Sequence, residues 1–418
     1  MSEAFAVRGQ VVTPNSILID GAVVVKDDRL AWIGESSAAQ GAGFGAEVAA
    51  ADSPTDGRYI IPGLVDVHCH GGGGQSFPDA ATADDAMVAV WEHRLHGTTS
   101  IVTSLVTQSP EALRRQAQML ADLADAGEIA GIHFEGPFVA EAHKGAQDPH
   151  YIQAPNPALM RELMIVTRGH TVTMTLAPEG KRAFGSGSVA EVLIENGALP
   201  SYGHTDCDSA TMRAAARWTR EKLGLTPEET RLSPRYTITH LFNGMEPFHH
   251  RKPGPVLEAI ADAAGGGAVL ELIGDGTHVH PDAVRSVYEL VGRDSMVLVT
   301  DAMAAAGMDD GDYVLGGQAV IVMDGKAYLR GEDGTPGSLA GGTAHLLDVV
   351  RNSWKNSGMS LVDAVYCGSM QGAKILGKEA EIGSLEAGKR ADLVVADENL
   401  YPLQVFRRGI QIASVPEA

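Results

Sequence analysis

The sequence has few cysteines and no long apolar run, and these absences exclude several classes of protein. Its three cysteines, Cys69, Cys207 and Cys367, are sparse and odd in number, so reduced thiols in a cytoplasm are expected instead of a disulfide framework. No run reaches the roughly 18 apolar residues that a membrane-spanning helix needs. The first residues, MSEAFAVRGQ, contain no basic stretch followed by an apolar one, so no secretory signal is predicted.

Basic and aromatic residues are also scarce. The 32 Lys and Arg residues against 53 Asp and Glu residues give a net charge of −21, which argues against a general nucleic-acid binder and a polybasic membrane-surface protein. Aromatic residues make up 5% of the chain, whereas 49 of its 418 residues are Gly. This balance favours an α/β protein over an aromatic-rich β sandwich. The 44% of hydrophobic residues are ample for a core.

From Tyr59 onward, short apolar runs alternate with longer helical segments. Eight strand-like runs separated by helices indicate parallel βα units, and eight such units indicate a (β/α)8 TIM barrel over residues 59–375. Helices are predicted near residues 84–96, 110–126, 156–168 and 281–291, with Ser109 and His280 close to two of the caps. The eight runs are YIIPGLVDVH, TTSIVTSL, IAGIHFE, TVTMTLAP, LPSYGH, YTITHLF, AVLELIG and SMVLVTDA.

The two ends of the chain are rich in short strands. Residues 1–58 and 376–418 flank the predicted barrel and are expected to meet in one small discontinuous β-sandwich domain. After the eighth run, residues 316–329 are predicted to form an inserted hairpin. Two further helices are expected near residues 343–356 and 361–376.

Residues that can bind a metal or transfer protons fall at the ends of the predicted barrel strands. They are His68 and His70 at the end of the first run, Glu135 at the end of the third, His204 at the end of the fifth, His240 within the sixth and Asp301 at the end of the eighth. Taken singly, each has an ordinary alternative, such as a helix cap, an ion-pair partner or a hydrogen-bonded core imidazole. Because strand ends converge on one face of a barrel, their joint occurrence predicts a site for divalent metal.

This set of residues suits metal-assisted hydrolysis. A divalent metal lowers the pKa of bound water and polarises a carbonyl group. Asp301 is the natural general base, which later returns the proton to a leaving group. His278, after the seventh run, is the candidate that polarises the scissile carbonyl. His280 competes for that role, and either residue could be an ordinary loop histidine.

Six motifs occur in this order at the barrel positions, and together they resemble the N-acetylglucosamine-6-phosphate deacetylases of the amidohydrolase superfamily. PGLVDVHCH alone indicates an amidohydrolase, whereas FEGPF and THLFNGM with the following HHRKPG are more specific to the deacetylases. The resemblance implies hydrolysis of the acetamide of N-acetyl-D-glucosamine 6-phosphate to glucosamine 6-phosphate and acetate. The motifs are PGLVDVHCHGGGG, IHFEGPF, GHTDCD, THLFNGMEPFHHRKPG, IGDGTHVHP and LVTDAM.

The resemblance also implies a division of roles within the metal site. Glu135, His204 and His240 would hold the main metal, and Glu135 would bridge to a second metal held with His68 and His70. Zinc is favoured, with iron, manganese or cobalt as alternatives and one or two ions bound. Asp301 resembles the general base and acid, and His278 the residue that polarises the carbonyl. A thiolate of Cys207 is a further, weaker ligand candidate.

The substrate contacts follow from the same resemblance. Asn243 and Gly244 resemble the contacts to the substrate phosphate, and Arg251 resembles an arginine that reaches the phosphate from a neighbouring subunit, which implies a homodimer. The HHRK patch at 249–252 supports phosphate binding independently, because an Arg fork recognises phosphate well, although it could be a solvated basic loop. The segment Leu339, Ala340 and Gly341 resembles a loop that lines the sugar pocket.

One residue departs from the family pattern. Gln147 stands where the family usually has a histidine that contacts the substrate. Gln still donates and accepts hydrogen bonds but cannot become cationic, so the epimer preference for the sugar stays open. The alternatives are an N-acetylgalactosamine-6-phosphate deacetylase, a cyclic-amide hydrolase and an inactive sugar-phosphate-binding protein. The second is disfavoured because Glu135, not a lysine, ends the third run.

Overall fold

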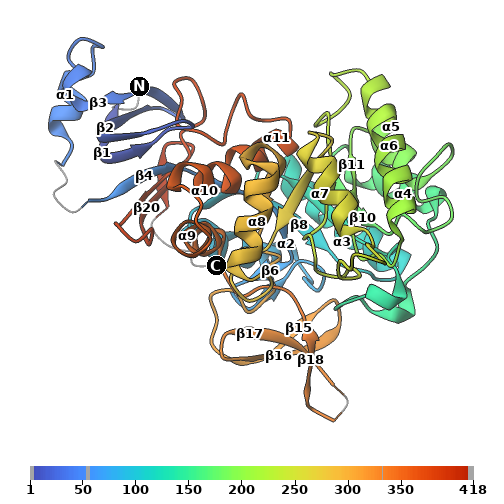
Figure 1. The fold of residues 1–418 in the computed structure, drawn as a ribbon. Coiled ribbons are helices and arrows are strands. Elements are labelled where there is room, and N and C mark those ends of the chain that lie inside the picture. Colours follow the sequence, from blue (N-terminus) through green and yellow to red (C-terminus); the bar gives the residue numbers. More distant parts are fainter. Residues whose placement is uncertain (1–3, 53–56, 332, 413–418) are drawn as a thin grey trace.

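The computed structural model describes residues 4–52, 57–331 and 333–412. Figure 1 shows a central barrel, a sheet domain at one side with strands from the N-terminal and C-terminal parts of the chain, and a small antiparallel sheet that projects from the barrel. Residues 1–3, 53–56 and 413–418 of the predicted end segments lie outside the described residues.

Eight parallel strands form the barrel, and they follow one another around it in chain order. Its closure joins the first strand to the segment after the last, because the Asp301 N–H donates to the His68 carbonyl (2.9 Å) and the His70 N–H to the Ala302 carbonyl (2.7 Å). The predicted TIM barrel is therefore confirmed. The strands are β5 (Leu64–Cys69), β8 (Thr98–Leu105), β9 (Gly131–Glu135), β10 (Thr171–Leu176), β11 (Leu199–Tyr202), β12 (Tyr236–Ile238), β13 (Ala268–Leu272) and β14 (Met296–Leu298).

Helices surround the barrel, and the main apolar cluster packs them against its strands. Ser109 caps α3 through a hydrogen bond from the Ala112 N–H, and Pro110 occupies the first turn, as the sequence predicts. The helices are α2 (Ala83–Leu95), α3 (Pro110–Asp125), α4 (Pro157–Thr167), α5 (Val189–Glu195), α6 (Ser209–Leu225), α7 (Val256–Ala264), α8 (Pro281–Val291), α9 (Leu346–Asn356), α10 (Leu361–Gly368) and α11 (Met370–Ile375). No helix in the described part of the chain is both long and apolar enough to cross a membrane.

The small domain, expected as a discontinuous β sandwich, consists of one seven-stranded sheet built from both ends of the chain. The sheet curls on itself, because Leu30 near one edge and Phe406 near the other belong to one apolar cluster. Its strands are, in spatial order, β21 (Ile410–Ile412), β20 (Pro402–Arg407), β19 (Leu393–Ala396), β4 (Tyr59–Pro62), β1 (Phe5–Val12), β2 (Ile17–Lys26) and β3 (Arg29–Glu35), with helix α1 (Gly45–Ala50) packed against it.

The first predicted barrel run is divided between the two domains. Its beginning, Tyr59–Pro62, pairs with β1 and β19 of the small sheet, and the barrel strand starts only at Leu64. Gly63 makes the turn possible, because a Cβ at this position would lie 2.2 Å from the Thr99 hydroxyl oxygen. The chain thus crosses from one domain to the other without a linker.

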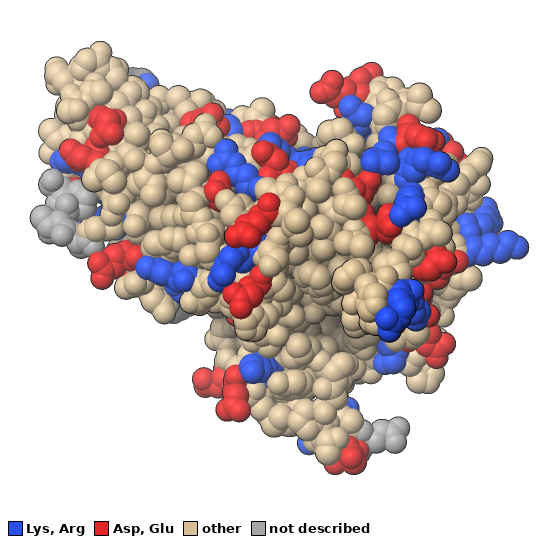
Figure 2. All heavy atoms as spheres, in the orientation of Figure 1, with Lys and Arg blue, Asp and Glu red and all other residues tan. Residues whose placement is uncertain are grey.

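The inserted hairpin is part of a larger sheet. The predicted segment 316–329 corresponds to β16 (Gln318–Met323) and β17 (Lys326–Arg330), and β15 (Gly311–Leu315) and β18 (Pro336–Leu339) complete four antiparallel strands. A two-stranded hairpin of β6 (Gly71–Gly72) and β7 (Gln75–Ser76) follows the first barrel strand. Figure 2 shows Lys and Arg interspersed with Asp and Glu on the visible face, as expected for a solvated surface.

Candidate active site and metal centre

A cavity of about 200 Å³ opens where the barrel strands end. It receives side chains from the ends of the first, third, fifth, sixth and eighth strands, from the loops that follow them, and from His278 in the loop after the seventh strand. This is the face on which barrel enzymes carry their catalytic groups. The predicted site residues that line it are His70, Glu135, Gln147, His204, His240, Asn243, Gly244, His278, Asp301, Leu339 and Gly341.

Glu135, His204 and His240 form one group of potential ligands. Glu135 Oε1 lies 3.0 Å from His204 Nε2 and 2.8 Å from His240 Nε2, and the two imidazole nitrogens are 3.1 Å apart. All three side chains are buried. Two imidazoles and one carboxylate that converge on a point are a typical set for a divalent metal.

A second group contains His68, His70, Glu135 and Asp301. His70 Nε2 lies 3.2 Å from Asp301 Oδ1 and 3.2 Å from Glu135 Oε2. His68 Nε2 is 3.1 Å from His70 Nε2 and 3.4 Å from Asp301 Oδ1. Glu135 therefore presents one oxygen to each group and stands between them.

The backbone is unusual at three of these residues. His204, His240 and Asp301 have φ angles of 46°, 24° and 49°, in a region that residues other than Gly rarely adopt. Such conformations persist where the surrounding structure enforces them, and they concentrate at functional sites. Each of the three lies just after a barrel strand, where the chain turns its side chain inward.

Two of the candidate ligand imidazoles, those of His68 and His204, are oriented by partners that the sequence did not reveal. His68 Nδ1 faces Glu271 Oε2 at 2.9 Å, and His204 Nδ1 donates to the His143 carbonyl at 2.7 Å. Such contacts select the tautomer and hold the ring of a metal ligand. Glu271 lies in the predicted run AVLELIG, where a carboxylate inside an apolar strand is the one signal that could have indicated it.

The chemistry of this donor set fits a divalent metal. Four imidazoles and two carboxylates are buried together, and their nitrogen and oxygen atoms face one another at distances of a hydrogen bond or little more. Nδ1 of His70 and Nδ1 of His240 have no hydrogen-bond partner among the described residues. Burial of this many charged and polar groups is costly unless protons or cations compensate it.

Both site carboxylates are held in the ionised form. Burial would raise the pKa of Asp301, but the charge of His68 and the hydrogen bond with His70 lower it below its usual value. Burial acts on Glu135 in the same way, and the charge and hydrogen bond of His204 outweigh it, so the pKa of Glu135 also lies below its usual value. An ionised Asp301 is ready to accept a proton at neutral pH.

His278 lies at the edge of the cavity with a fixed orientation. Its Nδ1 bonds Asp275 Oδ2 at 2.7 Å, which leaves Nε2 for a ligand. Burial would lower the pKa of His278, but the hydrogen bond and charge of Asp275 raise it above its usual value. The competitor His280 instead caps α8 by accepting from the Asp282 N–H and lies exposed, away from the cavity lining.

The predicted phosphate contacts are only partly brought together in one chain. Asn243 and Gly244 line the cavity, whereas Arg251 is exposed outside it, with its guanidinium 2.8 Å from His250 Nε2. In the part of the chain that the structure describes, no Lys or Arg lines the cavity. Ala340 is also outside the lining, because its side chain packs into the apolar cluster under the inserted sheet.

Both the nitrogen and the oxygen of the Gln147 side-chain amide form hydrogen bonds within the protein. Nε2 donates to Glu135 Oε2 at 2.6 Å, and Oε1 accepts from the Thr107 N–H at 2.7 Å. The side chain is 1% exposed, although its edge lines the cavity. Gln147 therefore contacts the carboxylate that stands between the two ligand groups, a contact that the sequence did not predict.

A buried histidine next to the site has no role in the sequence prediction. His133 bonds Ser104 Oγ and Thr175 Oγ1, both at 2.9 Å, and its ring centroid lies 4.4 Å from that of His68. Burial and the charge of His68 hold the pKa of His133 well below its usual value.

Cys207, the weaker ligand candidate, is buried outside the cavity lining, and burial raises the pKa of its thiol to about 12.

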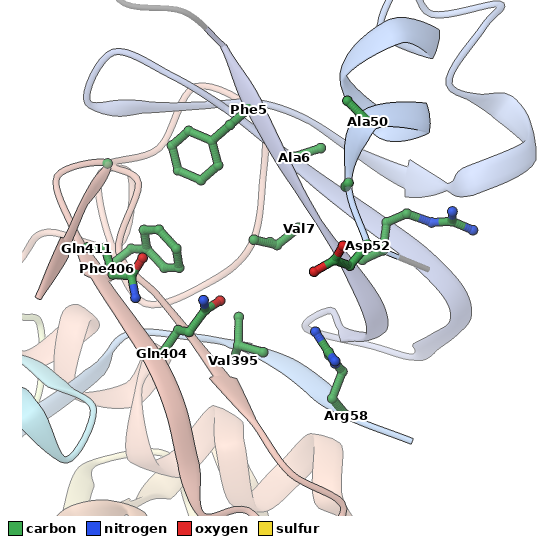
Figure 3. A pocket seen from close by; sticks show the side chains of 13 residues that line it. Phe5, Ala6, Val7, Ala50, Asp52, Arg58, Val395, Gln404, Phe406 and Gln411 are labelled. Carbon is green, nitrogen blue, oxygen red and sulfur yellow. The ribbon is translucent and has the colours of Figure 1, made fainter. Parts of the chain in front are cut away.

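A larger hollow of about 510 Å³ lies in the small domain (Figure 3). Phe5 and Phe406 face it from one side, and Asp52 and Arg58 from the other. None of the described residues that line it is a histidine or a cysteine. The predicted site residues instead line the smaller cavity of the barrel.

Comparison with known proteins agrees with this geometry. The sequence pattern of the amidohydrolase family matches residues 59–412, and the chain belongs to this family. Within it, the chain is similar to N-acetylglucosamine-6-phosphate deacetylases, which confirms the resemblance predicted from the motifs.

Three relatives illustrate the similarity. N-acetylglucosamine-6-phosphate deacetylase of Bacillus subtilis (strain 168) is 32% identical over 98% of this chain and 97% of its own length. N-acetylgalactosamine-6-phosphate deacetylase of Escherichia coli O157:H7 is 31% identical over 86% of this chain and 89% of its own length. A mutant N-acetyl-D-glucosamine-6-phosphate deacetylase from Mycobacterium smegmatis, in complex with N-acetyl-D-glucosamine-6-phosphate, has a TM-score of 0.85 at 34% identity, covering 98% of this chain and 99% of its own.

Proposed function

We propose that this chain is an N-acetylglucosamine-6-phosphate deacetylase, which hydrolyses the acetamide of N-acetyl-D-glucosamine 6-phosphate to D-glucosamine 6-phosphate and acetate. The observation that carries the proposal is the buried cluster of His68, His70, Glu135, His204, His240 and Asp301 at the mouth of the barrel. The family membership and the similarity to deacetylases of this name support the same substrate.

The chain's own residues would hold one or two divalent ions. Glu135, His204 and His240 suit the main ion, and His68 and His70 with the second oxygen of Glu135 suit another. Zinc fits imidazole and carboxylate ligands best, with iron, manganese or cobalt as alternatives. When bound, such an ion supplies an activated water and polarises the amide carbonyl.

Asp301 and His278 carry out the proton transfers and charge stabilisation. Ionised Asp301 accepts a proton from the attacking water and then delivers it to the amine nitrogen as the carbon–nitrogen bond breaks. His278, held through Nδ1 by Asp275, donates from Nε2 to the carbonyl oxygen as negative charge develops there.

Among the described residues no Lys or Arg lines the cavity, so the proposed phosphate contact needs a cation from elsewhere. We assign Asn243 and Gly244 to phosphate contacts from within the chain, and Arg251 to a contact across a homodimer. Leu339 and Gly341, with Ala340 between them, and Gln147 are assigned to the sugar side. The three free, buried cysteines support a reducing compartment such as the cytoplasm.

A steady-state assay of a small substrate panel tests the proposal. It compares the 6-phosphates of N-acetylglucosamine, N-acetylgalactosamine and N-acetylmannosamine with unphosphorylated N-acetylglucosamine, measuring acetate release and metal content. Highest kcat/KM for N-acetylglucosamine 6-phosphate supports it, whereas preference for the galactosamine epimer supports the alternative deacetylase. Equal rates with the unphosphorylated sugar would exclude the Arg251 assignment, and a metal-loaded chain that releases no acetate would indicate a binding protein.

A further inference from the structure

A second cluster of metal-binding side chains lies outside the catalytic centre. It contains Glu92 near the end of α2, His96 directly after that helix, and His345 at the N-cap of α9. One potential ligand atom from each residue lies within 4.8 Å of the others. None of the three lines the catalytic cavity.

The three side chains converge on one atom. Glu92 Oε1 lies 2.9 Å from His345 Nε2 and 3.2 Å from His96 Nδ1. The two imidazole rings stack with centroids 3.6 Å apart. The rings are nearly parallel, and His96 Nδ1 also donates to the Glu92 backbone carbonyl at 2.8 Å. His96 must therefore turn away from that carbonyl for both imidazoles to coordinate one divalent cation together with Glu92.

The surroundings of the cluster support a cation site. His345 Nδ1 faces Asp348 Oδ2 at 3.4 Å, and a carboxylate behind a histidine is a common support for a metal ligand. His93 lies beside the cluster, fully buried, with its ring centroid 5.5 Å from that of His345 and its Nδ1 without a hydrogen-bond partner among the described residues. The side chains of Glu92, His96 and His345 are 18%, 38% and 10% exposed, so an ion can reach them from solvent.

The cluster spans the seam of the barrel. Among the described residues, β5 and β14 share no ladder, and the junction contains the isolated bridge of Cys69 with Ala302. Helix α2 follows β5 in the chain, and α9 is the helix that follows β14 and the inserted sheet (Figure 1). A link between Glu92 or His96 and His345 therefore joins the two helices that flank this junction.

Two contacts connect the cluster to the catalytic segments. His93 Nε2 lies 2.8 Å from the Gly71 carbonyl, next to His70 in the chain. Gly307, in the loop after Asp301, packs so close that a Cβ there would lie 2.1 Å from Glu92 Oε1. His93 and Glu92 therefore pack against the segments that follow His70 and Asp301.

We propose that Glu92, His96 and His345 bind a divalent cation of the zinc class, which cross-links α2 to α9 across the barrel seam. The cation replaces the protons that the two imidazoles share with Glu92, and it takes its remaining ligands from water. Nitrogen and carboxylate oxygen donors favour Zn²⁺, Co²⁺ or Ni²⁺ over Mg²⁺ or Ca²⁺. This ion takes no part in the proposed hydrolysis.

Counting bound zinc tests the proposal. The full-length protein and its variants are dialysed against the same buffered micromolar Zn²⁺, and zinc per chain is measured by mass spectrometry. His345→Asn keeps a side chain that can cap α9 but removes the ligand nitrogen. His96→Gln removes the second imidazole. Each variant is expected to hold one zinc fewer per chain than the wild type, with deacetylase activity within about twofold.

His280→Asn is the matched control, because it makes the same change at the exposed N-cap of α8, where Asp282 is its acidic neighbour. It should leave the zinc count unchanged. Thermal unfolding gives a second measurement, since added Zn²⁺ should raise the midpoint more in the wild type than in His345→Asn. Equal zinc counts in the wild type and both site variants would overturn the proposal. So would a loss of zinc that always accompanies a loss of activity, because the ion would then belong to the catalytic centre.

Discussion

Glu135 is the residue on which the catalytic site depends most. Oε1 faces His204 and His240, while Oε2 faces His70 and the amide of Gln147. A carboxylate with this many partners can stay ionised although it is buried. Its orientation decides whether the two groups of ligands face each other.

Replacement of Gln147 by Leu should weaken metal binding by about 10- to 100-fold, because Glu135 loses the donor that orients Oε2. Metal affinity is measured by competition with a chelator. Gln116→Leu is the matched control, since Gln116 is also buried but donates to the carbonyls of Pro78 and Ala80. If Gln147→Leu instead raises KM and leaves metal affinity intact, Gln147 acts on the substrate alone.

Replacement of Asp301 by Asn should lower kcat by about 100- to 10,000-fold, because the amide cannot accept the proton of the attacking water. Metal content and the unfolding midpoint should stay close to those of the wild type, since Asn is isosteric. Steady-state kinetics and metal analysis on the same sample provide the test. A near-normal kcat would show that another group transfers the proton.

At the scale of the element, the loop after β12 is shaped around His204. Gly244 has a φ of 61°, and a Cβ at this position would lie 2.7 Å from His204 Nδ1. The Gly244 carbonyl also accepts from the Thr205 N–H at 3.0 Å, which ties the loop to the segment after His204. The small residue thus lets the loop pack directly on His204, a proposed metal ligand.

The change Gly244→Ala should therefore displace His204 and lower kcat/KM by about 100-fold, with reduced metal content. Gly266→Ala is the control, because Gly266 has a φ of 77° but a Cβ there would meet no other atom within 4 Å. Both variants carry similar backbone strain, and only the first affects the ligand. Equal losses of kcat/KM in the two would indicate that strain, not contact with His204, is responsible.

At the scale of the whole molecule, a net charge of −21 describes the surface, whereas phosphate binding depends on local charge. The cavity of one chain contains no Lys or Arg among its described lining residues, and Arg251 lies outside it. If Arg251 completes the site of a neighbouring copy, the working unit of the enzyme is a symmetric dimer.

Arg251→Ala should raise KM for the phosphorylated sugar by about 10- to 100-fold, because a charge-assisted contact is lost. Refolded or co-expressed mixtures of Arg251→Ala and Asp301→Asn chains should recover about a quarter of the wild-type rate, since half of the random dimers contain one complete site. The rate of each parent alone and of the mixture is measured at low substrate. Failure of the mixture to exceed its parents would place Arg251 in its own chain's site.

Much of the site could be predicted from the sequence because its information is local. Apolar runs of strand length recur eight times, and His68, His70, Glu135, His204 and Asp301 come at or just after their ends. The convergence of strand ends follows from the barrel itself. The helix starts at Pro110 and Pro281 could also be predicted from the sequence, since capping depends on neighbouring residues.

Other features required the tertiary structure. Glu271 supports His68 and Gln147 holds Glu135 across sequence separations that no periodicity encodes. Ala340 turns away from the cavity because the inserted sheet has its own apolar cluster. Tyr59–Pro62 joins the small sheet, where its partner strands β1 and β19 come from opposite ends of the chain, so no local pattern indicates the pairing.

The sequence by itself therefore determined the barrel and the chemical character of its mouth, because strand periodicity and residue type at strand ends are properties of short segments. Only the tertiary structure decided which carboxylate orients which imidazole. It also decided that Tyr59–Pro62, at the border of the two domains, pairs with the small sheet and not with the barrel. It also brought His96 and His345 together on Glu92 across the seam of the barrel. These pairings depend on how distant segments close upon one another, and a barrel closes only when all eight units are in place.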